Sequence, residues 1–250
     1  MKISTTQSKK YRLIGIAIWL ILWEVMYLAI NKDIYLPSPL SVLYSAVDVV
    51  GDEKFLEVII STSLRVTVSF AISAVLGIAT GFFCGLNDNL YHIFEPLILL
   101  IRSTPVISVI IIAIIWFKST YVPVFTGLLM CYPIIWTNMV QGIRETDGKL
   151  IEMCRIYKVK PFQVFKNVYL PSARPYILAG FTTSMGLAWK VVAAAEVLSM
   201  PRYAIGTRLH DTKIYLEIPE LMAWTMLIIL LSYLFENIIQ LIFKKAAMPR

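Results

Sequence analysis

Apolar residues fall into six long runs along this chain, and polar or proline-containing segments separate them. An α-helix rises 1.5 Å per residue, so about 20 apolar residues cross the roughly 30 Å hydrocarbon core of a bilayer. The pattern therefore predicts an all-α membrane protein with six transmembrane helices. The predicted spans are residues 13–30, 65–86, 93–117, 121–139, 176–198 and 221–243.

The first run has a second interpretation, as a secretory signal peptide. It is long, it contains Trp19, Trp23 and Glu24, and no small-x-small cleavage site follows it. These features are not those of a cleaved signal. We therefore predict a retained membrane helix, preceded by a cytoplasmic segment at residues 1–12.

Small residues recur at every fourth position of the second span. Residues four apart lie on one face of a helix, so this stripe allows another helix to approach closely. The pattern predicts helix packing, within the subunit or across a dimer, and indicates nothing about a substrate. The predicted packing residues are Ser73, Gly77, Gly81 and Gly85.

The third span contains an arginine next to a proline. Arg102 and Ser103 precede Pro105, and a proline inside a membrane helix frees a backbone carbonyl and kinks the helix. An intramembrane arginine beside a kink is typical of a cavity or pathway. The alternative is an Arg102 side chain that extends to the membrane surface, and both interpretations stay open.

The fifth span contains two ionisable residues, Lys190 and Glu196. They are six residues apart, so they are not an i,i+4 pair and each needs another partner or water. Lys190 lies deep in the span, where a charge needs a partner or a wet cavity. Two interpretations are open: a structural pair with Glu196 or another acid, and a cavity that favours an anion. The predicted pathway residues are Arg102, Ser103, Lys190 and Glu196.

The most polar long stretch between two spans is residues 152–171. Pro161 suits the first turn of a short helix, and Phe162 and Phe165 lie three residues apart on one apolar edge. We expect Leu170-Pro171 to end this helix. One interpretation is an amphipathic loop on the membrane surface. The other is a docking helix that inserts its apolar edge into a groove on a soluble partner.

The distribution of basic residues predicts the orientation. With the N-terminus in the cytoplasm, 14 of the 23 Lys and Arg fall on inner segments and 7 on outer segments, the other two being Arg102 and Lys190. Such an excess on the inner side is the usual pattern. Six spans then place both termini and the 152–171 stretch in the cytoplasm, where a docking helix for a cytosolic partner must be.

Composition limits the function. Only 16% of the residues are charged, mean hydropathy is +0.72, and two histidines and three scattered cysteines provide no metal-site spacing or disulfide framework. A soluble domain has about 25% charged residues, so this composition favours a protein embedded in a bilayer.

Sequence motifs argue against an enzyme. The chain has no G-x-x-x-x-G-K-[ST] motif, so we expect no ATP hydrolysis by this chain alone. The absence of H-E-x-x-H and G-x-S-x-G argues against an intramembrane enzyme. We expect no cofactor, metal or nucleic acid on this chain.

The 152–171 stretch resembles the EAA loop of ABC importer permeases, which reads Glu-Ala-Ala, three residues, Gly, nine residues, then Ile-x-Leu-Pro. Glu152 stands at the Glu position, Lys158 at the Gly position and Val168-x-Leu170-Pro171 at the end, while Met153-Cys154 replace the alanines. A glycine there permits positive φ. Lys158 must therefore take the left-handed conformation at a cost or bend the turn differently.

Other segments extend the resemblance over residues 13–245, to the permease subunit of a type I ABC importer in the nitrate, sulfonate and taurine branch. Their shared order is more specific than any one motif. They are Leu36-Pro37-Ser38-Pro39, Ser63-Leu64-Arg65 with Gly77 and Gly81, Pro96 through Arg102-x-x-Pro105 to Ile115-Trp116-Phe117, and Gly186-Leu187-Ala188-Trp189-Lys190 to Ala195-Glu196.

This resemblance implies the type I ABC importer permease fold in a multi-pass protein of the cell membrane. The permease domain would be residues 13–245, with a cytoplasmic coupling helix in 152–171 and a cytoplasmic tail at 246–250. The implied partners are two cytosolic ATPase subunits that hold ATP and Mg, a second permease copy in a homodimer, and an extracytoplasmic binding protein that delivers a small, anionic solute. The implied coupling residues are Glu152, Lys158, Pro161, Phe162, Phe165, Leu170 and Pro171.

An ion-coupled secondary transporter is the alternative function. Arg102, Lys190, Glu196 and Glu236 lie within predicted spans and would suit such a protein. Inverted repeats are the usual signature of that class, and the sequence shows none.

Overall fold

The structure is a computed structural model that describes the backbone of residues 5–247 and, within it, the side chains of residue 11 and residues 14–244. Residues 1–4 and 248–250, which belong to the predicted cytoplasmic segment and tail, lie outside the described residues. Every regular element in the described chain is a helix, which agrees with the predicted all-α class. The elements are α1 Thr5–Ile30, α2 Pro39–Val50, α3 Phe55–Leu86, α4 Asp88–Ser103, α5 Val106–Trp116, α6 Val122–Arg144, α7 Gly148–Ile156, α8 Pro161–Val164, the π-helix Phe165–Tyr169, α9 Leu170–Ser199, α10 Ile205–Tyr215 and α11 Ile218–Ala247.

Four helical stretches of the described residues are long and apolar enough to cross a membrane. They are α3, α6, the continuous helix Pro161–Ser199 and Ile218–Lys244 of α11. A fifth is obtained if α4 and α5 are counted as one broken span, bent by 98° between Ser103 and Val106. The apolar part of α1, Ile14–Ile30, is shorter. The structure thus accounts for four or five of the six predicted spans by length and composition.

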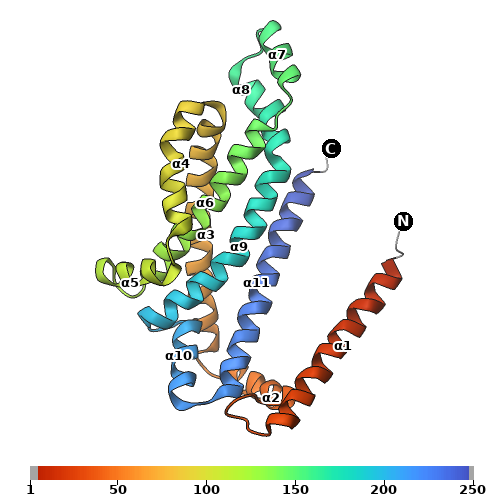
Figure 1. The fold of residues 1–250 in the computed structure, drawn as a ribbon, viewed down its shortest axis with the longest axis vertical. Coiled ribbons are helices and arrows are strands. Elements are labelled where there is room, and N and C mark those ends of the chain that lie inside the picture. The colour runs from red at the N-terminus through yellow and green to blue at the C-terminus, as the bar shows by residue number, and fades with distance from the viewer. Residues whose placement is uncertain (1–4, 248–250) are drawn as a thin grey trace. The chain divides into compact units, whose positions relative to one another are not determined.

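The break in the predicted third span is sharper than a kink. Thr104 and Pro105 are extended, with ψ of 128° and 131°, and α5 starts directly after them. A residue that precedes proline is driven out of the helical region. The sequence prediction that Pro105 interrupts this span is therefore confirmed, and Figure 1 shows α5 turned away from the direction of α4.

The chain divides into two compact units. The first contains residues 1–56 and 208–227. In it, Ser38 caps α2, because its Oγ accepts the Ser41 N–H at 3.0 Å, and Pro39 occupies the first turn. The Trp23 indole N–H donates to the Pro37 carbonyl at 3.0 Å, which holds the end of α1 to the start of α2.

The second unit contains residues 57–207 and 228–250. At its centre α6 packs against α9, where Gly142 lies against Ala173 and Gly180 against Asn138. In Figure 1, α7 and α8 lie beyond the common end of α6 and α9. This unit contains all the pathway, packing and coupling residues predicted from the sequence.

The small-residue stripe of α3 faces α6. A Cβ added at Gly77, Gly81 or Gly85 would lie 2.7–2.9 Å from a side chain of α6, which is closer than real Cβ atoms approach. Ser73 continues the stripe and donates its hydroxyl to the Leu128 carbonyl at 2.9 Å. The structure therefore places the partner of this stripe within the same subunit. The opposing side chains are Ile135, Met139 and Ile143.

Candidate functional site

The segment between α6 and α9 begins with a helix that ends in a left-handed residue. After α7, Lys158 has φ of +50°. Its N–H bonds to the Arg155 carbonyl at 3.1 Å, and the Val159 N–H bonds to the Cys154 carbonyl at 2.9 Å. These two bonds form a Schellman motif, whose left-handed position is usually glycine. Of the two conformations open to Lys158 from the sequence, the structure has the left-handed one.

The prediction that Leu170-Pro171 ends the coupling helix is wrong. The chain stays helical from Pro161 to Ser199, through α8, the π-helix and α9. The Leu170 N–H bonds to the Phe165 carbonyl, five residues back, so the turn before Pro171 is wider than an α-turn. Pro171 has no N–H to donate, and proline is accepted in the first turn of a helix. The local rule that proline stops a helix therefore does not apply here.

Phe162 and Phe165 do not form one exposed edge. The Phe162 side chain is 71% exposed. Phe165 is half-buried, and its ring packs edge-on against the Phe82 ring of α3 with centroids 4.9 Å apart. Phe165 thus anchors the segment to its own subunit, while Phe162 is available to a partner.

Three more apolar side chains of the segment between α6 and α9 are exposed. Ile156 is 78% exposed, Tyr157 76% and Met153 47%. We call Met153, Ile156, Tyr157 and Phe162 the coupling surface. Exposed apolar groups with a polar surround mark interaction sites. The exposed charged side chains of the same segment are mostly basic: Glu152, Arg155, Lys158, Lys160 and Lys166.

At the opposite end of α9, Glu196 lies in a buried polar network. Its side chain has no exposed surface, and Arg65 Nη1 of α3 lies 2.7 Å from its Oε1. The Thr62 hydroxyl donates to the same carboxylate at 3.0 Å, and the Gly206 N–H donates at 3.0 Å. Arg65 also donates to the Tyr203 carbonyl at 2.9 Å. The network joins α3, α9 and the start of α10.

This network corrects the proposed pairing of Lys190 with Glu196. Glu196 is paired with Arg65 and fully hydrogen-bonded, so it serves as a structural acid. A buried carboxylate needs a cation and donors to offset lost hydration. Sequence reasoning missed Arg65 because it was placed at the outer end of a span, where a basic residue needs no partner.

Lys190 is exposed and lines a different cavity, of about 220 Å³, between α9 and α11. Within the described residues it forms no ion pair. Trp189 and Glu236 line the same cavity, and the Ser232 hydroxyl lies 3.5 Å from Glu236 Oε1. The cavity therefore holds one cation and one carboxylate that are not paired with each other.

Arg102 and Ser103 lie apart from this cavity. Arg102 is exposed at the end of α4 and lines another cavity of about 220 Å³ with Tyr91, Glu95 and Trp136. Ser103 donates its hydroxyl to the Leu100 carbonyl at 3.1 Å, as many serines at helix ends do. The structure does not bring the predicted pathway residues of α4 and α9 into one site.

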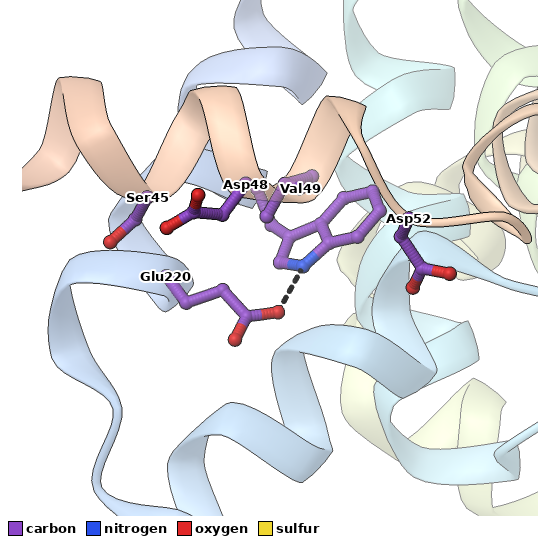
Figure 2. Close-up of a pocket in the computed structure, with 6 residues that line it drawn as sticks. Ser45, Asp48, Val49, Asp52 and Glu220 are labelled. Atoms are coloured by element: carbon purple, nitrogen blue, oxygen red, sulfur yellow. Dashed lines mark hydrogen bonds between the residues drawn. The ribbon is translucent and has the colours of Figure 1, made fainter.

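The first unit contains a polar pocket that the sequence did not indicate. Its volume is about 170 Å³, and Ser45, Asp48, Asp52 and Glu220 are on its walls (Figure 2). Two of its acids are already bound. The Trp224 indole N–H donates to Glu220 at 3.0 Å, the dashed bond in Figure 2, and Arg208 donates to Asp52 at 2.8 Å. No group of three His, Cys, Asp or Glu among the described residues is arranged to hold a metal ion.

The sequence is similar to known membrane transport proteins. The sequence profile of the family described as binding-protein-dependent transport system inner membrane component matches residues 73–250. The nitrate import permease protein NrtB of Synechocystis sp. is 29% identical over 199 residues, which cover 74% of this chain and 70% of that protein. The taurine transport system permease protein TauC of Escherichia coli is 24% identical over 223 residues, 86% of this chain and 80% of that protein.

A solved structure has the same fold. A chain of the MetNI methionine ABC transporter, in an inward-facing conformation, superposes with a TM-score of 0.64 at 17% identity. The match covers 78% of this chain and 97% of that chain. At this identity the likeness concerns the fold alone.

Proposed function

This chain belongs to the binding-protein-dependent transport system inner membrane component family, and on that premise we propose that it forms the translocation pathway of an importer for a small solute with an oxyanion group. As an ABC transporter permease subunit it is not itself the ATPase. The alternative of an ion-coupled secondary transporter loses its support, because the family works with a separate ATPase.

The substrate class in this proposal rests on the relatives. Their names state nitrate, taurine, bicarbonate and aliphatic sulfonates as cargo. Nitrate and bicarbonate are small oxyanions, and taurine and the aliphatic sulfonates each carry a sulfonate group. Identities of 24–29% do not transfer one of these substrates to this chain. The shared chemistry supports an oxyanion, and an extracytoplasmic binding protein would deliver it.

In the proposed topology the chain crosses the membrane six times and both termini are cytoplasmic. The spans are α1, α3, the broken helix of α4 and α5, α6, the Pro161–Ser199 helix and α11. The excess of Lys and Arg on the segments placed inside supports this orientation. It puts the coupling surface in the cytoplasm.

The coupling surface is the single observation that carries the proposal. Four apolar side chains are exposed on the segment between α6 and α9, and most of the exposed charged residues of that segment are basic. A soluble partner that covers this surface would bury the apolar groups and meet the basic ones with acidic groups. We assign that role to a cytosolic ATPase subunit, one on each copy of a permease homodimer.

The proposal is tested by purification of the tagged chain from its host in mild detergent. We expect two ATPase subunits for two permease copies, and ATP hydrolysis that a loaded binding protein stimulates. A chain that purifies without an ATPase, and that transports solute in response to an ion gradient alone, contradicts the proposal.

A further inference from the structure

The cavity between α9 and α11 contains charges of both signs within one unit of the fold. Lys190 lies on α9 and Glu236 on α11, and neither forms an ion pair within 4.0 Å in the described part of the chain. Unpaired charges in a membrane span face water or a ligand in most known cases, because lipid does not solvate them. This cavity therefore differs from the Arg65–Glu196 network, where the charges neutralise each other directly.

A buried donor without an acceptor lies at the same place. The Trp189 side chain has no exposed surface, and its indole N–H has no hydrogen-bond acceptor among the described residues. Phe235 packs edge-on against the indole, with ring centroids 5.3 Å apart, and fixes its orientation. A buried N–H is satisfied in most proteins by protein, water or ligand. Trp189 is on the wall of the cavity, and because its N–H has no accessible surface the indole contributes an apolar face there.

The carboxylate of Glu236 is held against α9. Gly186 faces Glu236 Oε1, and a Cβ at Gly186 would collide with that oxygen. The Ser232 hydroxyl donates to the same oxygen at 3.5 Å. Gly186 lies one helical turn before Lys190 on α9. The Glu236 carboxylate, which faces Gly186, is therefore about one turn from Lys190 along the helix axis.

From these observations, and resting on the proposed importer function, we infer that this cavity is a cargo subsite for a small zwitterion, a short molecule with an ammonium group and an oxyanion. Lys190 would bind the oxyanion, and Glu236 would bind the ammonium group. A simple anion would meet the Glu236 carboxylate as well as Lys190. A zwitterion satisfies both charges, and the volume of about 220 Å³ admits a molecule of a few heavy atoms.

The test measures binding to the purified permease–ATPase complex in nanodiscs, without the binding protein. The probes are radiolabelled taurine and β-alanine, and the competitors are ethanesulfonate and propionate, which lack the ammonium group. We expect a zwitterion to bind at least tenfold more tightly than its analogue. Lys190→Met should abolish binding, and Glu236→Gln should reduce the preference for the zwitterion to less than threefold.

Two further variants separate a bound cargo from a merely charged surface. Gly186→Ala keeps both charges but displaces the Glu236 carboxylate, so it should weaken zwitterion binding at least fivefold. Lys118→Met removes an exposed charge on the α5–α6 connection and should leave binding unchanged. Equal binding of zwitterion and analogue by the unmodified complex, or no binding of either zwitterion, overturns the subsite.

Failure of the subsite is distinguishable from failure of the importer function. A complex that assembles and hydrolyses ATP but binds no zwitterion removes the subsite and leaves the function. If no ATPase co-purifies, the proposed function fails, and the same measurement on the permease alone still decides the subsite.

Discussion

Arg65 Nη1 lies 2.7 Å from Glu196 Oε1, 131 residues away along the chain, and the carboxylate has no exposed surface. The pair joins the start of the second predicted span to the end of the fifth. Thr62 and Gly206 complete the shell of donors around the acid. The start of α10 and the ends of α3 and α9 that lie beside it are therefore held by one ion pair.

The first prediction concerns this pair. Arg65→Met leaves a buried carboxylate without its cation, and we expect a loss of about 3–5 kcal/mol in stability. Adding Glu196→Gln should recover most of that loss, because Gln still accepts from Thr62 and Gly206. Thermal unfolding in detergent measures both variants. The control is Arg208→Met, whose partly exposed pair with Asp52 should contribute no more than about 1 kcal/mol. If Arg65→Met and the unmodified protein have the same melting temperature, the Arg65–Glu196 pair does not stabilise the fold.

The second prediction concerns the contact of α3 with α6. In Gly81→Ala the new Cβ would lie 2.9 Å from Met139 Cβ and 3.0 Å from the Trp136 carbonyl oxygen. The helices must move apart, at about 1–3 kcal/mol, and Gly81→Leu should prevent folding. The matched control is Gly148→Ala, where nothing lies within 4 Å of the new Cβ. Measured by thermal unfolding, an effect of the same size in both alanine variants would show that the stripe is not a packing surface.

The third prediction separates the two phenylalanines of the coupling segment. Phe162→Ala should weaken retention of the ATPase, by about 2 kcal/mol if Phe162 is a central contact, and should leave the melting temperature of the permease alone unchanged. Phe165→Ala should lower that melting temperature, because it removes the packing against Phe82. Co-purification and thermal unfolding are measured for each variant. A Phe162→Ala protein that retains its ATPase and transports normally shows that the partner docks elsewhere.

The fourth prediction uses the left-handed residue after α7. Because Lys158 has φ of +50°, Lys158→Gly should remove backbone strain and stabilise the permease by up to about 1 kcal/mol. Lys158→Ala keeps the strain and should give no gain. Lys160→Gly is the control, since Lys160 has φ of −59° and glycine there only adds freedom to the unfolded chain. If the Lys158→Gly and Lys158→Ala variants have the same melting temperature, the turn is not strained.

The hydrophobic pattern predicted where the long helices lie, because burial in lipid demands long apolar runs whatever lies beside them. It did not predict all their ends: α3 starts at Phe55 and not at residue 65, and the helix of the fifth span starts at Pro161 and not at residue 176. The break at Pro105 was also predictable, since proline constrains its own residue and the one before it. Both features depend on residues that are close together in the chain. For Lys158 the sequence left two conformations open, and the structure has the left-handed one.

Contacts between distant segments were not predictable in this way. The three-residue spacing of Phe162 and Phe165 indicated a shared helical edge, but Phe82 lies opposite only one of them. The partner of Glu196 is on another helix, and nothing near Glu196 in the sequence indicates it. Pro171 was misjudged because the wider turn before it depends on how the whole Pro161–Ser199 helix packs.

The unbroken helix from Pro161 to Ser199 has a mechanical consequence. Its 39 residues extend about 58 Å at 1.5 Å per residue. One end carries Phe162 of the coupling surface, and the other carries Glu196, which is tied to α3 and α10. A tilt of about 5° about the Phe162 end would move the far end by roughly 5 Å, about one helical turn. If the proposed ATPase binds the coupling surface, the helix would act as a lever, and a small rearrangement of the ATPase would become a displacement the size of a solute molecule.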